Sequence, residues 1–321
     1  MIPDQPPALL VAGPTASGKS ALALAIAERV GGTVINADSM QVYRDLRIIT
    51  ARPIPEDETR VPHRLYGVRA ASEAASVAWW RSEALSAMAA AHAEGRLPIL
   101  CGGTGLYFAA LTQGLSDIPP VPMPAREEAR RLLAQEGPAA LHARLAAADP
   151  DTAARLRPSD SQRVARAFEV WRGTGRGLAS WQAGGGTGPA PWRFAAILID
   201  PPRDALRAAI AERWAAMLAA GVVEEVRALA AHGLDPALPA MRAHGVPELV
   251  AMLAGRMAPD DASRRAILNT GQYTKRQATW FRHHALADPS RTHTIHARIA
   301  GPAQLSERIW ADIISFVDRV R

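Results

Sequence analysis

The sequence predicts an α/β protein: a parallel sheet with flanking helices, joined by an all-helical insertion domain and C-terminal helices. Three observations predict this class. A phosphate-binding loop follows an apolar run, further short apolar segments alternate with helical stretches, and one segment bounded by proline and glycine has no strand pattern. Alternation of this kind is typical of a parallel sheet. The length of 321 residues suffices for one large unit and a smaller one.

The first element is a strand, expected over residues 9–13, that leads into a glycine-rich loop. The loop fits G-x-x-x-x-G-K-[ST], and an alanine-rich helix over 21–30 follows it. In this setting backbone amides at a helix N-terminus bind phosphate oxygens, the lysine adds a mobile charge, and the hydroxyl ligates Mg²⁺. We therefore predict a P-loop NTPase-like sheet with Ser20 as the metal ligand. The predicted pyrophosphate site comprises Gly13, Pro14, Thr15, Ala16, Ser17, Gly18, Lys19 and Ser20.

The rest of the chain is organised around the remaining strands. They are expected where short apolar runs occur, at 33–36, 97–102 and 194–200. A proline run opens, and a glycine run closes, the strand-free segment between them. The predicted units are a core of 1–117 and 193–321 and a helical insertion of 118–192. The C-terminal helices are expected over 203–220, 222–232, 245–253 and 260–286.

Composition and charge narrow the class of protein. Lys and Arg number 37 against 31 Asp and Glu, giving a net charge of +6. A protein that binds a polyanion gains free energy by releasing counterions. The net charge is therefore compatible with nucleic-acid binding but does not by itself decide for or against it. The single cysteine, Cys101, excludes an internal disulfide framework. No apolar stretch approaches the roughly 18 residues of a membrane span. We expect a soluble, cytoplasmic protein with no membrane partner.

The second strand runs into the sequence Asn-Ala-Asp-Ser-Met-Gln-Val-Tyr, with the aspartate at Asp38. An acid just past a strand's carboxyl end lies in the crevice where open α/β sheets bind ligands. Asp38 is therefore a candidate general base. An aspartate or Ser39 here is equally suited to capping a following helix. The residues leave both interpretations open.

The third strand ends without the aspartate that an ATPase normally needs to hold Mg²⁺. Gly102, Gly103 and Gly105 follow instead, with Thr104 among them. These glycines either bring the backbone close to a ligand, with the Thr104 hydroxyl as a donor, or serve only a tight turn. Past the fourth strand, Arg203 is a candidate fork for pyrophosphate or simply a surface arginine at a helix start.

Basic and aromatic residues alternate near the C-terminus, over residues 272–284. Nucleic-acid surfaces combine cations with aromatic rings in this way. On a helix, Lys275, Thr279 and Arg282 share one face. We expect Trp280 and Phe281 to lie in the core, which leaves the cationic side free for phosphates.

Together these motifs resemble the tRNA dimethylallyltransferases, also called tRNA isopentenyltransferases, of the bacterial type. The resemblance spans residues 9–282 and is carried by segments 13–20, 38–43, 102–107, 162–167 and 275–282. It implies transfer of a dimethylallyl group from dimethylallyl pyrophosphate to N6 of adenosine 37 in tRNA, with Mg²⁺ as cofactor. The implied partners are dimethylallyl pyrophosphate and the anticodon stem-loop, with no obligate protein partner and a monomeric state. A pyrophosphate without a γ-phosphate to hydrolyse explains the missing acid.

The resemblance also implies roles for single residues. Asp38 would accept the N6 proton, while Lys19 and Thr104 would act on the pyrophosphate. The family's usual Ala-Ile-Gly-Tyr segment appears here as Ala-His-Gly-Val-Pro over residues 243–247, so it departs from the pattern, notably at His244 and Pro247. The implied tRNA contacts are Asp38, Ser39, Met40, Gln41, Thr104, Arg126, Gln162, Arg163, Val164, Ala165, Arg166, Arg242, Ala243, His244, Gly245, Val246, Pro247, Lys275, Arg276, Gln277, Ala278, Thr279, Trp280, Phe281 and Arg282.

Two other functions fit part of the pattern. An adenylate isopentenyltransferase acting on free AMP or ATP would share the P-loop and the aspartate, but would not need the basic C-terminal segment or a large insertion. A non-catalytic P-loop RNA-binding switch would need the acid that is missing after the third strand.

Overall fold

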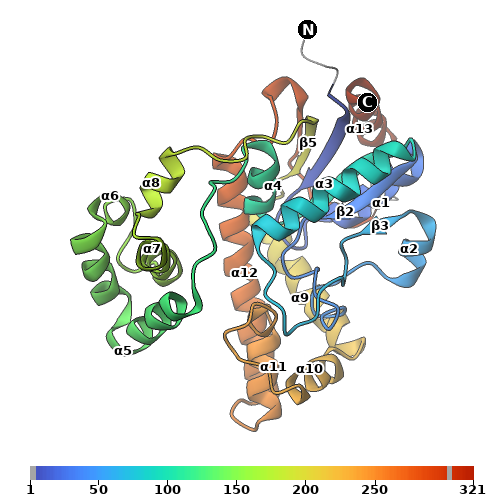
Figure 1. The fold of residues 1–321 in the computed structure, drawn as a ribbon. Coiled ribbons are helices and arrows are strands. Elements are labelled where there is room, and N and C mark those ends of the chain that lie inside the picture. The colour runs from blue at the N-terminus through green and yellow to red at the C-terminus, as the bar shows by residue number, and fades with distance from the viewer. Residues whose placement is uncertain (1–4, 302–305) are drawn as a thin grey trace. The chain divides into compact units, whose positions relative to one another are not determined.

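The computed structural model describes residues 5–301 and 306–321. It divides into two compact units, one formed by Met1–Thr112 and Ala190–Arg321 and the other by Gln113–Pro189. The boundaries of the second unit differ by a few residues from the insertion expected at 118–192. Figure 1 shows the sheet and the helices that surround it in the first unit.

The first unit is built on a six-stranded sheet in which every pair of neighbouring strands is parallel. The strand order is β3-β2-β4-β1-β5-β6. The four expected strands are confirmed, and two short edge strands, β3 and β6, were not predicted. The strands are β1 (Pro7–Ala12), β2 (Gly32–Asn36), β3 (His63–Arg64), β4 (Leu97–Gly102), β5 (Arg193–Ile199) and β6 (Thr292–Ile295).

Side chains of the central strand β1 alternate between two hydrophobic cores, one on each face of the sheet. Leu9 belongs to the core that contains Leu22 of α1 (Lys19–Val30) and Phe316 of α13 (Glu307–Val320). Leu10 belongs to the opposite core, with Trp80 of α3 (Val77–Ala93). Helices thus cover both faces, which explains why the strand is apolar throughout. The helices of this unit are α1 (Lys19–Val30), α2 (Pro55–Arg60), α3 (Val77–Ala93), α4 (Gly105–Thr112), α9 (Arg203–Ala219), α10 (Val222–Ala231), α11 (Val246–Leu253), α12 (Pro259–His283) and α13 (Glu307–Val320), with short 3-10 turns η1 (Ala240–Arg242) and η2 (Pro289–Arg291).

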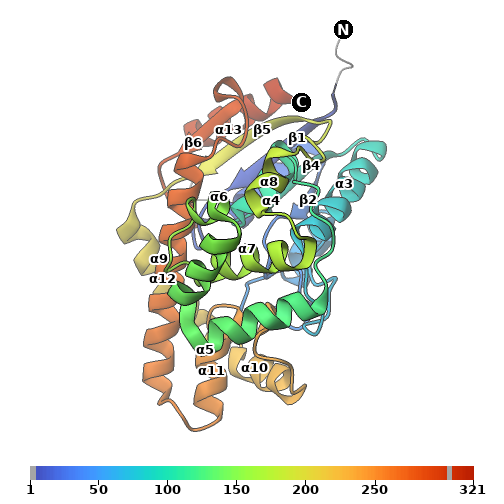
Figure 2. The ribbon, with the colours of Figure 1, turned by 60° about the vertical axis from the view of Figure 1, so that its left-hand side comes forward.

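The second unit consists of helices, as expected, and Figure 2 shows them. Its helices are α5 (Met123–Ala148), α6 (Pro150–Ala153), α7 (Ser161–Thr174) and α8 (Leu178–Ala183). Helix α5 is bent at Gly137, where the backbone leaves the helical conformation. Leu132 and Leu141 of α5 pack with Val164 and Phe168 of α7 to form a small core. The unit therefore has its own hydrophobic centre.

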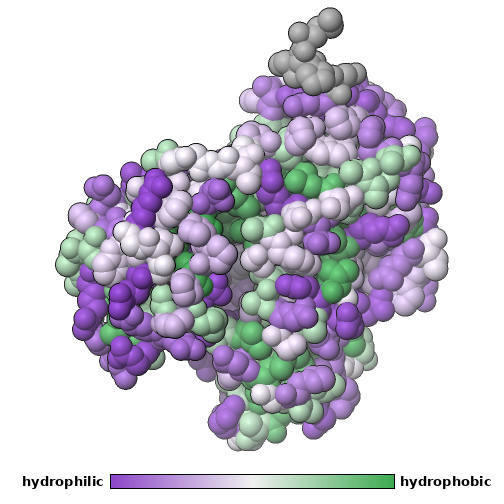
Figure 3. Space-filling model, in the orientation of Figure 1, coloured by the Kyte–Doolittle hydropathy of each residue, from purple (hydrophilic) through white to green (hydrophobic). Residues whose placement is uncertain are grey.

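The surface mixes hydrophilic and hydrophobic residues, as the face drawn in Figure 3 shows. Among the residues that the structure describes, no helix is both long enough and apolar enough to cross a membrane.

Candidate functional site

Three loops converge at the carboxyl edge of the sheet. The P-loop follows β1, Asp38 follows β2, and Thr104 follows β4, and these strands are neighbours in the sheet. The second and third loops are tied together. The Ser39 amide donates a hydrogen bond to Oγ1 of Thr104 at 2.9 Å, and the Thr104 amide donates to the carbonyl of Ala37 at 3.2 Å. Residues far apart in the sequence therefore form one site, at the edge where such sheets bind ligands.

The P-loop has a conformation that requires glycine at its end. Gly18 has φ of 94° and precedes the first turn of α1. A Cβ there would also lie 1.7 Å from the carbonyl oxygen of Ile299, which no side chain tolerates. Lys19 folds over the loop, and its Nζ donates to the carbonyl of Pro14 at 3.3 Å. Burial lowers the pKa of Lys19, because the ammonium loses water, and the nearby Asp38 carboxylate partly opposes this.

Gln277, a glutamine of α12, forms hydrogen bonds with the P-loop. Oε1 of Gln277 accepts hydrogen bonds from the amide of Thr15 at 2.9 Å and from its hydroxyl at 3.1 Å. Nε2 of Gln277 donates to the carbonyl of Gly103 at 2.9 Å. The side chain is 4% exposed. Gln277 therefore joins two loops of the site, and its buried side chain has little surface to offer tRNA.

The segment after β6 holds the other side of the P-loop. The amide of Ile299 donates to the carbonyl of Ser17 at 2.9 Å. Nε of Arg298 donates to the carbonyl of Ala16 at 3.3 Å. No motif in the sequence indicated this segment, because its contribution is largely backbone.

Asp38 stabilises a turn and faces several ionisable groups. Its Oδ1 accepts a hydrogen bond from the amide of Met40 at 2.9 Å. The residues that follow form turns, and the next helix begins only at Pro55, so the helix-cap interpretation is wrong. The carboxylate also acts electrostatically on Lys19 and Arg213. Asp38 is thus a side chain that stabilises its own loop and still lies among cations.

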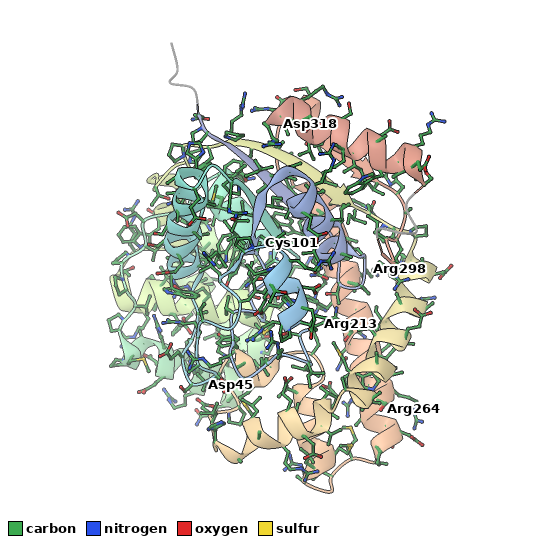
Figure 4. All side chains as sticks on the ribbon, turned by 90° about the vertical axis from the view of Figure 1, so that its right-hand side faces the viewer. Asp45, Cys101, Arg213, Arg264, Arg298 and Asp318 are labelled. Atoms are coloured by element: carbon green, nitrogen blue, oxygen red, sulfur yellow. The ribbon has the colours of Figure 1, made fainter. Side chains whose placement is uncertain are left out.

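Arg213 is a site residue that sequence reasoning missed. It extends from α9 (Figure 4) and its Nη2 donates to the carbonyl of Thr50 at 3.0 Å. Burial lowers the pKa of Arg213, and Asp38 opposes the shift. A signal was present in the sequence, since Arg213 continues the buried apolar positions of α9, Leu206, Ala209, Ile210 and Met217, at helical spacing.

Arg203, the predicted fork, lies in the first turn of the same helix and is exposed. Ten residues separate it from Arg213, which is about 15 Å along a helix. The surface interpretation, which the sequence had left open, fits this placement.

A polar pocket adjoins Thr104 at the start of α11. The rings of His244 and Tyr273 lie 4.6 Å apart, and the Arg276 guanidinium lies 5.6 Å from the Tyr273 ring. The phenol of Tyr273 interacts with Thr104 and Gln277, and burial raises its pKa. Burial and the charge of Arg276 lower the pKa of His244. The residues lining the pocket are Arg242, His244, Pro247, Glu248, Asn269, Gln272 and Arg276.

The other residues expected on tRNA include an exposed set and a buried set, and Met40, Gln41, Arg126 and Trp280 are of intermediate exposure. Among the exposed ones, Arg282 forms a fork with Asp200 at 2.9 and 3.1 Å. The side-chain amide of Gln41 already forms hydrogen bonds within the protein, because its Nε2 donates to the carbonyls of Thr50 and Ala51. The exposed residues are Gln162, Arg163, Arg166, Arg242, Pro247, Lys275, Arg276, Thr279 and Arg282. The buried residues, whose side chains have little surface to offer tRNA, are Val164, Ala165, Ala243, Val246, Gln277, Ala278 and Phe281.

Comparison with known proteins agrees with this geometry. The family model described as IPP transferase matches residues 41–284. The chain belongs to the IPP transferase family. Among curated relatives, proteins named tRNA dimethylallyltransferase from Acidiphilium cryptum and Granulibacter bethesdensis are each 61% identical. The first match covers 98% of this chain and 96% of the relative, and the second covers 97% of each.

Solved IPP transferase structures share the fold. The tRNA isopentenylpyrophosphate transferase of Bacillus halodurans is 31% identical, with a TM-score of 0.68 over 98% of this chain and 97% of that one. A eukaryotic dimethylallyltransferase acting on tRNA has a TM-score of 0.79, covering 98% of this chain and 80% of that one. At 24% identity it supports the fold alone. The P-loop NTPase-like prediction is confirmed.

Proposed function

We propose that this enzyme transfers a dimethylallyl group from dimethylallyl pyrophosphate to N6 of adenosine 37 in tRNA and releases pyrophosphate. The observation that carries the proposal is the grouping of Lys19, Arg213 and Asp38 at the mouth of the P-loop, where their charges interact. Two partly buried cations, one of them in the phosphate-binding loop, suit a pyrophosphate. A carboxylate beside them suits removal of a proton. The names of the relatives give a dimethylallyl group as what those proteins transfer and tRNA as its acceptor, which supports this choice of substrates.

The exocyclic amine of adenine is a poor nucleophile. The reaction therefore requires both removal of a proton from the amine and stabilisation of the leaving pyrophosphate. As the bond between N6 and the allylic carbon forms, the bond from that carbon to the pyrophosphate oxygen breaks. Lys19, Arg213 and the P-loop amides would stabilise the negative charge that develops on the leaving group. Asp38 would accept the N6 proton, an effect worth typically ~10²–10⁴ in rate.

Mg²⁺ fits the site as a metal held mainly by the substrate. Ser20 lies exposed at the start of α1, and the Ser17 hydroxyl is buried without a hydrogen-bond partner among the described residues. Over residues 5–301 and 306–321, no group of three His, Cys, Asp or Glu side chains is placed to hold a metal. Mg²⁺ commonly takes few protein ligands and completes its shell with phosphate oxygens and water. Ser20 would hold the ion, which would supply charge neutralisation.

The anticodon stem-loop of tRNA would meet two exposed basic surfaces, each on one unit. Lys275, Arg276 and Arg242 lie on the first unit, and Arg163 and Arg166 lie on α7 of the second. Their side chains suit phosphate contacts. The target adenine would have to leave the stacked loop, at a cost of a few kcal/mol. A tRNA substrate would place the enzyme in the cytoplasm.

A transfer assay with labelled dimethylallyl pyrophosphate tests the proposal. We expect label in tRNA that contains adenosine 37, and none when that adenosine is replaced by guanosine. Asp38→Ala should cut the transfer rate by at least ~10² while tRNA affinity in filter binding changes little. Transfer to free AMP instead of tRNA would favour an adenylate isopentenyltransferase. Near wild-type turnover of Asp38→Ala would place the base elsewhere.

A further inference from the structure

The carboxylate of Glu225, on α10, accepts hydrogen bonds from three consecutive backbone amides of another loop. Oε2 accepts from the amides of Arg47 and Ile48 at 2.8 and 2.7 Å. Oε1 accepts from the amide of Ile49 at 2.9 Å. A carboxylate that receives several amide hydrogen bonds makes a strong, directional contact, because charged acceptors form shorter and stronger bonds. The side chain therefore fixes the backbone of residues 47–49.

That loop leads directly to the contact that orients Arg213. Residues 48–51 form a turn in which the amide of Ala51 donates to the carbonyl of Ile48 at 2.9 Å, with Ala51 at φ of 48°. The carbonyl of Thr50 inside this turn accepts from Nη2 of Arg213 at 3.0 Å. The same carbonyl accepts from Nε2 of Gln41 at 2.9 Å. The position of one carbonyl thus sets the position of the guanidinium.

We propose that Glu225 is a positioning residue for the reaction. By fixing the amides of residues 47–49 it places the Thr50 carbonyl, and that carbonyl aims Arg213 at the pyrophosphate. The inference rests on the proposed function, in which Arg213 binds that anion.

A glutamate suits the three amides better than its near relatives. Its two oxygens offer enough lone pairs for three donors, whereas glutamine would present an NH₂ group to at least one N–H. Aspartate has the same charge but is one methylene shorter, so it reaches fewer of the amides. The side chain of Ile49 also packs near Gly245, so the loop stays attached to the unit when the Glu225 contact is weakened.

Glu225 has a matched control beside it on the same helix. Glu224 is exposed and pairs only locally with Arg227, at 3.0 Å and three residues away. Exposed pairs of this kind contribute little to stability. Glu224→Gln therefore makes the same chemical change without touching the loop.

A double-mutant cycle with Arg213 separates positioning from simple stabilisation. The variants are Glu225→Gln, Arg213→Ala and their combination, with Glu224→Gln as control. Each is measured for kcat/KM toward dimethylallyl pyrophosphate at saturating tRNA, for the Kd of inorganic pyrophosphate, and for thermal unfolding. Two sites that act through one another deviate from additivity.

We expect Glu225→Gln to lower kcat/KM and pyrophosphate affinity about tenfold, mainly by raising KM, while Glu224→Gln stays within twofold. In the Arg213→Ala background, Glu225→Gln should change both quantities less than twofold. An equal loss in both backgrounds, or no loss in folded Glu225→Gln, would overturn the positioning role. If Glu225→Gln does not fold, Glu225→Asp takes its place in the same cycle, with the same outcomes deciding. A wild-type enzyme that fails to bind pyrophosphate would refute the proposed function itself.

Discussion

Replacing Gln277 by alanine tests whether α12 braces the P-loop. The change removes three hydrogen bonds, two to Thr15 and one to Gly103, at 2.9 to 3.1 Å. At a net contribution of about 0.5–1.5 kcal/mol for each bond, the variant should lose about 1.5–4.5 kcal/mol of unfolding free energy. The Thr15 amide also belongs to the phosphate cradle. With its brace gone, we expect pyrophosphate affinity to fall about tenfold, equivalent to about 1.4 kcal/mol.

Urea unfolding gives the first quantity and titration calorimetry with inorganic pyrophosphate gives the second. Gln272→Ala is the matched control, because Gln272 lies on the same helix and is exposed. It should change unfolding free energy by less than about 0.5 kcal/mol. If Gln277→Ala unfolds at the same urea concentration as Gln272→Ala and binds pyrophosphate equally well, the brace is not a determinant of the loop.

Three further predictions follow from charge and burial. The double variant Lys275→Ala/Arg276→Ala should bind tRNA more weakly. The slope of the logarithm of the tRNA association constant against the logarithm of the salt concentration should fall by about 1.5, since each phosphate contact contributes roughly 0.7–0.9. An unaltered slope in a folded double variant would mean that these charges are only solvated. Burial lowers the pKa of Lys19, and a bound anion favours its protonated form, so pyrophosphate binding should weaken, and take up a growing fraction of a proton, as pH rises through the lowered pKa. Calorimetry in two buffers of different ionisation enthalpy measures this uptake, and equal uptake by Lys19→Met would assign it to another group. Burial raises the pKa of the Cys101 thiol to about 11, so iodoacetamide at pH 8 should alkylate it only in denaturant; fast labelling of the native protein would contradict its burial.

The parts of the fold that the sequence predicts are those with local signals. The strand β1 is apolar on both faces because helices cover both, and its loop carries a spacing that only phosphate binding explains. The C-terminal helices α9 to α12 follow from apolar periodicity. Such signals depend only on residues that are close in the sequence, so these elements can be predicted without knowledge of the fold.

The features that sequence reasoning missed depend on distant neighbours. The strand β3 has only two residues and exists because β2 offers it an edge. Likewise, Ile299 contributes a backbone amide to the P-loop, and any residue except proline has one. Arg213 could have been noticed in the sequence as a charged residue on an otherwise apolar helix face. Its role in the site follows only from the fold, which brings Asp38 and Thr50 near it.

The segment 275–282 shows how one motif combines two roles that the sequence alone merges. The resemblance implies tRNA contacts for the whole segment, although Trp280 and Phe281 are expected in the core, and the helical period separates its residues. Lys275 and Arg276 are exposed, whereas Gln277 and Phe281 are buried. The exposed face is available to phosphates and the buried face holds the P-loop, so substitutions on the two faces should alter different measurements. Loss of tRNA affinity with intact pyrophosphate binding belongs to the first face, and the reverse belongs to the second.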